Sequence, residues 1–110
     1  MFRLFWADES GLPADDRGLA YGDGLFETIR MVEQKGVLLS RHLERMVRDA
    51  GRLGIEVSRR DLANVCVQAA QRFAGRFRGE GWILKLTLTR GSGGRGYRPA
   101  PGMEPNLLVS

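Results

Sequence analysis

The sequence has little of three residue types that often carry chemistry: its 110 residues include one cysteine, one histidine and two lysines. A lone cysteine, Cys66, excludes an internal disulfide and a cysteine-based zinc cluster. Because His42 has no second histidine to pair with, no metal site is expected. We expect Cys66 to be a small apolar side chain in a helix interior rather than a reactive thiol.

Long hydrophobic runs are also missing. The longest apolar segment is far shorter than the roughly 20 residues that a membrane-spanning helix needs. Residues 1–6 are too short for a signal peptide, and the acidic Asp8 and Glu9 follow almost at once. We therefore expect a cytoplasmic protein. Its apolar content of 43% is ordinary, and its length suits one domain.

Acidic residues are fewer than basic ones, 13 against 17, and the net charge is +4. Fifteen of the basic residues are arginines, which lie between Arg3 and Arg98 in no run longer than two. Acids are interleaved with them, and aromatic residues do not alternate with them as in a platform on which bases stack. The charge indicates a modest preference for anionic ligands. A non-enzymatic module that binds anions or nucleic acid is the weakest alternative.

Four segments have the composition or the alternation of β-strands: residues 2–6, 25–33, 82–89 and 106–110. In the third, Trp82, Leu84, Leu86 and Leu88 face one way, and Ile83, Lys85, Thr87 and Thr89 face the other. Residues 34–36 predict a hairpin turn, and residues 37–39 the return strand. The sequence ends within the last predicted strand, which we take as a sign of truncation.

Two helices are predicted between the strands. The first begins after Ser40, a suitable N-cap, and ends at Gly54. Its apolar positions are Leu43, Met46, Val47, Ala50 and Leu53. The second has a capping box of Ser58 and Asp61 and covers residues 59–77. Its buried stripe is expected to be Leu62, Val65, Cys66, Ala69, Phe73 and Phe77. Short turns between the strands favour an α+β fold, with two helices packed on one side of an antiparallel sheet.

The strand over residues 25–33 has two different faces. Leu25, Ile29 and Met31 lie on one, and Phe26, Thr28, Arg30 and Val32 on the other. We expect Arg30 to be buried beside Phe26 and Thr28, with Glu44 or Asp23 as its anionic partner. Glu27 lies on the opposite face and is expected to be structural.

The arginines of the first helix, Arg41, Arg45, Arg48 and Arg52, follow one another at spacings of four, three and four. This periodicity places them on one side of the helix, opposite its apolar positions. Taken alone, it predicts a solvated face. His42 is expected to be structural or exposed rather than catalytic.

A glycine-rich segment follows residue 89, and Gly91, Gly93 and Gly96 satisfy the G-x-G-x-x-G pattern. A dinucleotide site also needs a helix to begin at that loop, because the helix N-terminus holds the pyrophosphate. Residues 97–102 contain two prolines and a glycine and cannot begin such a helix. The segment is therefore either a hairpin tip or a loop that presents Arg95 and Tyr97 to a ligand.

Three motifs together resemble the N-terminal part of the fold-type IV pyridoxal-phosphate enzymes, the class IV aminotransferase family. They are residues 16–28 (Asp-Arg-Gly-Leu-Ala-Tyr-Gly-Asp-Gly-Leu-Phe-Glu-Thr), residues 42–46 (His-Leu-Glu-Arg-Met) and residues 90–97 (Arg-Gly-Ser-Gly-Gly-Arg-Gly-Tyr). Within that family the last motif is similar to the loop that borders the substrate pocket in aminodeoxychorismate lyases, often across the subunit interface. The resemblance covers nearly the whole chain.

The resemblance implies a cofactor, pyridoxal 5'-phosphate, and assigns its phosphate to Arg45, whose fork suits phosphate oxygens. It makes seven residues candidates for substrate contact: Lys85, Arg95, Tyr97, Arg30, Thr28, Phe26 and Tyr21. It places the Schiff-base lysine in a second domain past Ser110, so neither Lys35 nor Lys85 is that lysine. Taken alone, Lys85 is the better nucleophile candidate of the two, although a solvated strand lysine is the simpler interpretation.

The activity that the resemblance implies is conversion of 4-amino-4-deoxychorismate to p-aminobenzoate and pyruvate, a step of folate synthesis, by a homodimer. Residues 1–110 would then be one α+β domain, the N-terminal half of a two-domain enzyme, and inactive without the other half. The main alternative is a branched-chain or D-amino-acid aminotransferase of the same fold.

Overall fold

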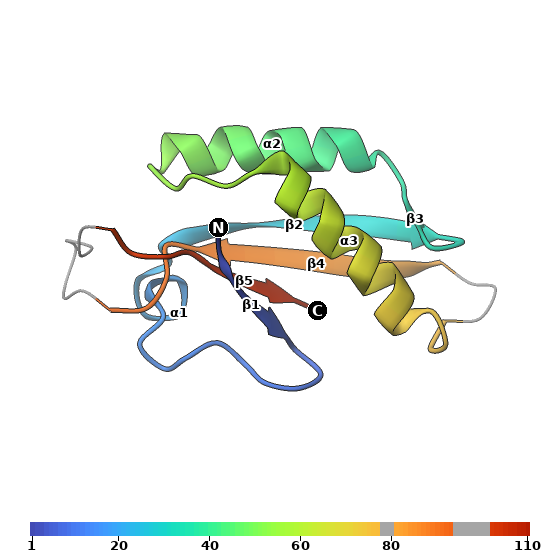
Figure 1. Ribbon diagram of the computed structural model, residues 1–110, viewed down its shortest axis with the longest axis horizontal. Coiled ribbons are helices and arrows are strands. Elements are labelled where there is room, and N and C mark those ends of the chain that lie inside the picture. Colours follow the sequence, from blue (N-terminus) through green and yellow to red (C-terminus); the bar gives the residue numbers. More distant parts are fainter. Residues whose placement is uncertain (78–80, 94–101) are drawn as a thin grey trace.

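The computed structural model describes residues 1–77, 81–93 and 102–110, which form one five-stranded sheet and three helices (Figure 1). In chain order the elements are β1 (Arg3–Trp6), α1 (Arg17–Tyr21), β2 (Gly24–Val32), β3 (Lys35–Gly36), α2 (Leu39–Arg52), α3 (Arg59–Phe73), β4 (Trp82–Thr89) and β5 (Asn106–Val109). Figure 1 shows α3 lying across one face of the sheet and α2 running along its β2 edge. The predicted α+β class, with a helical layer on the sheet, is confirmed.

The strand order in the sheet is β1-β5-β4-β2-β3. β2 and β4 form a long antiparallel ladder from the Gly24–Thr89 pair to the Met31–Trp82 pair. β4 and β5 are also antiparallel, but β1 and β5 are parallel. The sheet is thus mostly antiparallel, and the expectation of only antiparallel pairs is wrong for β1. This strand is separated from β5 by most of the chain, so no hairpin constrains its direction.

The hydrophobic core lies between the sheet and the helices α2 and α3. The alternation predicted for β4 is confirmed from Trp82 to Leu88: Leu84, Leu86 and Leu88 are fully buried, and Trp82 is nearly so. Ile29 and Met31 of β2 point to the same side. Each such side chain stabilises the fold by about 1.5–3 kcal/mol relative to an exposed one.

The ends of α2 are only partly as predicted. Ser40 is not the N-cap; the helix begins at Leu39, after Leu38 in the left-handed conformation. The Ser40 hydroxyl instead accepts a hydrogen bond from Arg59. The stop at Gly54 is confirmed, since Gly54 has a φ of 75° and Ile55 N–H donates to the Ala50 carbonyl. This pattern is a Schellman motif, which satisfies the last helical carbonyls.

α3 begins as predicted, because the Ser58 hydroxyl accepts a hydrogen bond from Asp61 N–H. The helix ends at Phe73, four residues before the predicted end. Phe77 is consequently half-exposed rather than part of a buried stripe, although its ring stacks on Trp82 with 5.2 Å between centroids. Cys66 is buried as predicted, and burial raises the pKa of its thiol to about 11.

The hairpin after β2 turns one residue earlier than predicted. Glu33 and Gln34, with φ values of 50° and 64°, form the two-residue turn, while Lys35 pairs with Val32 in β3. Two consecutive positive φ values are typical of the type I′ turn, whose twist matches that of the strands. The return over residues 37–39 is not a strand, since α2 starts at Leu39.

The short helix α1 was not predicted. Its N-cap is Asp16, a fully buried carboxylate that accepts hydrogen bonds from Leu19 N–H, the Thr89 hydroxyl and the Asn106 amide. Thr89 is therefore buried, although the alternation in β4 predicts it on the outer face. This network joins α1 to the ends of β4 and β5.

No helix within the described ranges is both long and apolar enough to cross a membrane.

Candidate functional site

The centre of the candidate site is a carboxylate held by two basic side chains. The alternation of β2 turns Glu27 toward α2, where its side chain is 5% exposed. Arg45 of α2 donates from Nε to Glu27 Oε2 at 2.8 Å and from Nη2 to Oε1 at 2.6 Å. A forked pair of charge-assisted hydrogen bonds is strong and orients both groups.

His42 completes this cluster. It lies one helical turn before Arg45, so both side chains lie on the same side of α2. Its Nδ1 is 2.6 Å from Glu27 Oε1, and its side chain is 18% exposed. His42 therefore contacts a buried carboxylate and helps to hold it in place.

The protonation of Glu27 reflects two opposed effects. Burial alone would raise the pKa of the Glu27 carboxyl, but the hydrogen bonds from Arg45 and His42 outweigh it and the pKa is below its ordinary value. The hydrogen bonds and charge of Glu27 in turn raise the pKa of the Arg45 guanidinium. Glu27 is therefore ionised at neutral pH.

The Arg45 guanidinium still has capacity for an anion. Its side chain is 54% exposed, and the contacts with Glu27 use only the Nε–Nη2 edge. The residue borders a surface hollow, which we call the α2 hollow, lined by Leu38, Arg41, His42, Glu44, Arg45 and Arg48. A cluster of arginines whose planar forks offer several N–H donors suits a phosphate group. The residues present thus fit the phosphate of a cofactor.

The other arginines of α2 lie at the surface, as their periodicity predicts. Arg48 and Arg52 have side chains that are 59% and 72% exposed, and both contact the carboxylate of Asp49. Arg41 is exposed as well. Arg45 differs from them because its partner is buried.

A second group of candidate residues lies on the sheet face away from the helices. Phe26, Thr28 and Arg30 of β2 are exposed there, and Lys85 of β4 is the register partner of Thr28. The Lys85 ammonium lies 4.5 Å from the centroid of the Phe26 ring. A cation over an aromatic face is a favourable arrangement that also limits the positions the ammonium occupies.

These two groups meet at one strand. Glu27 and Arg45 lie on the helical side of β2, and Phe26 and Thr28 on the other side. Among the described residues β3 pairs only with Met31 and Val32, so the preceding part of β2 forms a sheet edge.

The start of β2 is held by a separate ionic cluster. Asp23 accepts hydrogen bonds from Arg17 and Arg90, at 3.2 and 2.7 Å. Burial would raise the pKa of the Asp23 carboxyl, but these two hydrogen bonds keep it below the ordinary value. The Arg17 guanidinium also lies 4.7 Å from the centre of the Tyr21 ring, which is half-exposed. Tyr21 is the last residue of α1, and this helix packs beside β2, the strand that carries Phe26.

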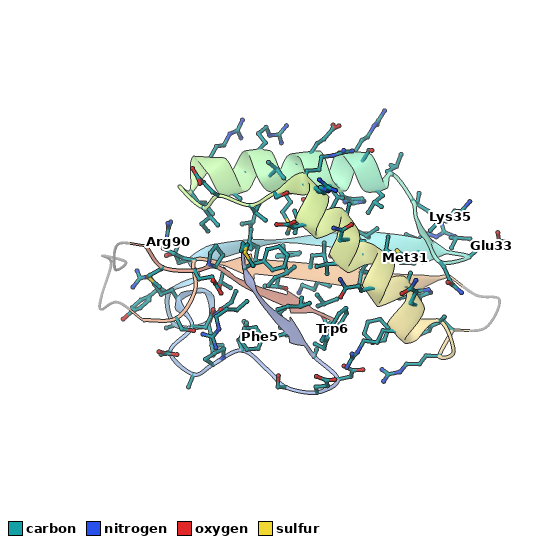
Figure 2. The ribbon with its side chains drawn as sticks, in the orientation of Figure 1. Phe5, Trp6, Met31, Glu33, Lys35 and Arg90 are labelled. Atoms are coloured by element: carbon teal, nitrogen blue, oxygen red, sulfur yellow. The ribbon has the colours of Figure 1, made fainter. Side chains whose placement is uncertain are left out.

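The structure corrects one expectation about the site and leaves others open. Arg30 is exposed, not buried, and its proposed partners are elsewhere: Asp23 holds Arg17 and Arg90, and Glu44 lines the α2 hollow. The reason is that the helices cover only the other face of β2. Arg95 and Tyr97 lie outside the described residues. Lys35 lies in β3, next to the hairpin turn, at the opposite end of the molecule from Arg90 (Figure 2).

Sequence reasoning placed Glu27 on the correct face but missed its contact with Arg45. The available signal was an acidic residue on the same strand face as the apolar Leu25, Ile29 and Met31. A buried carboxylate requires a partner, and the basic residues of the adjacent helix could supply it.

Comparison with known proteins decides the family. The amino-transferase class IV family matches residues 24–110, which include β2, α2, α3, β4 and β5. The chain belongs to the class IV aminotransferase family. This family comprises fold-type IV enzymes that depend on pyridoxal phosphate, so the predicted resemblance is confirmed at that level.

Members of this family with different activities are similar to the chain. The crystal structure of 4-amino-4-deoxychorismate lyase from Pseudomonas aeruginosa is 37% identical, with a TM-score of 0.81, over 92% of this chain and 35% of that one. D-alanine aminotransferase of Bacillus licheniformis is 30% identical over 107 residues, 97% of this chain and 37% of the relative. A hypothetical aminotransferase from Mycobacterium tuberculosis in its PLP-bound form is 27% identical, with a TM-score of 0.75, over 92% of this chain and 34% of that one.

The chain therefore spans little more than a third of the length of the class IV relatives it matches. The match shows that this part of the chain belongs to the family, but it does not by itself identify the reaction of a whole enzyme.

Proposed function

We propose that this chain is the N-terminal part of a pyridoxal-phosphate-dependent lyase that converts 4-amino-4-deoxychorismate to p-aminobenzoate and pyruvate. The observation that carries the proposal is the arrangement of cationic groups on the two sides of β2. Arg45 is held beside the α2 hollow on one side, and Lys85 lies over Phe26 on the other. The cofactor phosphate and a substrate with two carboxylates both require such groups.

Arg45 is the proposed phosphate ligand. Its Nη1–Nη2 edge is the one that Glu27 does not occupy, and Arg41 and Arg48 add positive charge around the same hollow. The PLP-bound form of the Mycobacterium tuberculosis relative supports the choice of cofactor. When bound, pyridoxal phosphate supplies an electron sink for the bonds next to the substrate amine.

Lys85, Thr28 and Arg30 are the proposed substrate contacts on the sheet. Lys85 and Arg30 offer positive charge to the substrate carboxylates. Thr28, which pairs with Lys85 across the ladder and precedes Arg30 by two residues on β2, offers a hydroxyl donor. Phe26 supplies an apolar surface against which a ring can pack. Tyr21, Arg95 and Tyr97 are proposed to border the same pocket, the last two from the loop that follows β4.

These residues bind and orient rather than move protons. The Lys85 ammonium, which lies over the Phe26 ring, loses less freedom when the substrate arrives than an unrestrained one would, and this favours the geometry in which the substrate reacts. The lysine that attaches the cofactor and transfers the proton is proposed to lie past Ser110, in a second domain. A homodimer is proposed as well, in which the loop after β4 reaches the neighbouring pocket.

The test is a direct assay of the whole enzyme that contains this chain. We expect p-aminobenzoate to form from 4-amino-4-deoxychorismate without any oxo-acid acceptor, and to be detected by its fluorescence. Arg45→Gln should lower retention of pyridoxal phosphate after dialysis, measured by cofactor absorbance. An enzyme that forms no p-aminobenzoate contradicts the proposed reaction.

A second candidate is an aminotransferase, which the 30% identity to D-alanine aminotransferase favours. It would use the same phosphate site but would transfer an amino group from D-alanine or a branched-chain amino acid to 2-oxoglutarate. Formation of glutamate from these donors, with no p-aminobenzoate from the lyase substrate, identifies this alternative.

A further inference from the structure

We infer that Glu27 is a positioning residue: it holds the Arg45 guanidinium so that the remaining edge of that group is presented to a phosphate. The inference rests on the proposed function, because it takes Arg45 as the phosphate ligand. It adds a role for a residue that makes no contact with the phosphate itself.

The Glu27 carboxylate is well suited to hold another side chain. Its backbone belongs to β2 and pairs with Leu86 in the centre of the long β2–β4 ladder. The side chain is almost fully buried, and His42 contacts Oε1 while Arg45 contacts both oxygens. An acceptor fixed by the sheet and by a second partner has little freedom to follow Arg45, so Arg45 follows it.

The guanidinium group has two edges that can form a forked pair. Glu27 takes the Nε–Nη2 edge. The Nη1–Nη2 edge has no partner among the residues that the structure describes, and the side chain is 54% exposed beside the α2 hollow. Holding one edge therefore fixes the direction of the other, which is the edge available to an anion.

The neighbouring arginines of the hollow lack this restraint. Arg48 contacts Asp49, which is adjacent in the chain and itself exposed, and Arg41 is exposed. Their guanidinium groups add positive charge but keep more rotational freedom. Only Arg45, of these three, is held by a carboxylate from the sheet.

Two effects of Glu27 on phosphate binding have opposite signs. Its negative charge lies close to the site and weakens attraction of an anion, whereas its hold on Arg45 removes the cost of ordering a long side chain. The electrostatic effect is reduced by solvent, because Arg45 is half-exposed. The geometric effect is retained, because a forked contact needs the plane of the guanidinium to be oriented toward the phosphate. We therefore expect the hold on Arg45 to dominate.

The experiment measures the affinity of the apo form of the whole enzyme for pyridoxal phosphate and for pyridoxal, which lacks the phosphate. Glu27→Gln should weaken binding of pyridoxal phosphate roughly three- to tenfold, by returning rotational freedom to Arg45. Binding of pyridoxal should change less than about twofold. A general structural defect would weaken both ligands, so the ratio of the two affinities is the decisive quantity.

Glu44→Gln is the matched control. Glu44 lines the same hollow and is exposed, so its replacement removes one negative charge of the hollow without touching the Glu27–Arg45 pair. The control should bind pyridoxal phosphate as tightly as the unmodified enzyme or more tightly. If Glu27→Gln behaves like this control, only charge matters and the inference is wrong.

A further variant covers the case in which Glu27→Gln does not fold. Glu27→Asp keeps the charge but shortens the side chain, so it should also weaken binding of pyridoxal phosphate selectively; unchanged affinity overturns the inference.

The Arg45→Gln variant distinguishes failure of the proposed phosphate site from failure of the positioning role alone. If Arg45→Gln leaves the affinity ratio unchanged, the phosphate site fails and the inference with it. If Arg45→Gln lowers the ratio while both Glu27 variants leave it unchanged, only the positioning role is overturned.

Discussion

The Thr89 hydroxyl donates a hydrogen bond to the buried Asp16 carboxylate, and this contact joins the end of β4 to the N-cap of α1. Asp16 is fully buried, and its carboxylate also accepts hydrogen bonds from the side-chain amide of Asn106 and from the backbone N–H of Leu19. The contact connects residues 73 positions apart in sequence. It holds α1, and with it Tyr21, beside the first residues of β2.

Loss of this hydroxyl should destabilise the protein. Thr89→Val keeps the shape of the side chain but leaves a buried carboxylate with one donor fewer, which costs about 1–3 kcal/mol in the free energy of unfolding. Urea denaturation followed by circular dichroism measures the effect. Thr87→Val is the control, because Thr87 lies on the open face of the same strand and is partly exposed. It should change stability by less than about 0.5 kcal/mol.

Two glycines should respond to alanine in opposite directions. At Gly18 an added Cβ would lie 2.3 Å from Thr89 Cγ2 and 2.9 Å from its Cβ. Such overpacking costs about 1–3 kcal/mol, so Gly18→Ala should lower the melting temperature. At Gly51, within α2, an added Cβ meets nothing within 4 Å. Gly51→Ala should raise stability by about 0.5–1 kcal/mol, because alanine favours the helix. Equal effects of the two changes would contradict the packing at Gly18.

Stability should fall in acid, and Glu27 should contribute to the fall. Its pKa is lower in the folded protein than in the unfolded chain, so its ionised form contributes stability at neutral pH. That contribution is fully present above the unfolded pKa of about 4.3 and is lost as pH falls through the lower folded value. Asp23 has a lowered pKa for the same kind of reason and acts in the same direction.

Comparison with Glu27→Gln separates this contribution from the others. The variant should be less stable than the unmodified protein at pH 7, and the difference should shrink below about pH 4. Denaturant midpoints measured from pH 7 to pH 2.5 give the two curves. Parallel curves over that range would mean that Glu27 keeps the same pKa on unfolding.

The two lysines should differ in their effect on catalysis. Lys85 lies over Phe26 on the open face of the sheet, whereas Lys35 lies in the β2–β3 hairpin. In the whole enzyme, Lys85→Gln should raise KM for the proposed substrate by about tenfold, as expected for loss of a charged hydrogen bond of about 1.4 kcal/mol. Lys35→Gln should leave KM and kcat unchanged. An unchanged KM for Lys85→Gln removes this residue from the substrate site.

Patterns of local sequence predicted much of the fold. The alternation from Trp82 to Leu88 gave the orientation of β4 because one face of that strand is buried along its length. The stop at Gly54 and the cap at Ser58 were predictable because each depends on a few adjacent residues. The pairing of β1 with β5 was not, since it joins segments from opposite ends of the chain.

The candidate site was likewise predictable only in part. Arg45 could be selected from the motif of residues 42–46, and the faces of β2 from its alternation. The exposure of Arg30 could not be predicted from the sequence, because it depends on which face of the sheet the helices cover.

The sequence by itself determined the family, the strand faces and the helix that carries Arg45, because motifs and periodicities are local properties of the chain. Only the tertiary structure decided that Glu27 holds Arg45 and that Asp16 holds Thr89. Those contacts depend on how a helix docks on a sheet and where a loop closes. Many weak packing interactions determine that docking together, and no short segment encodes it.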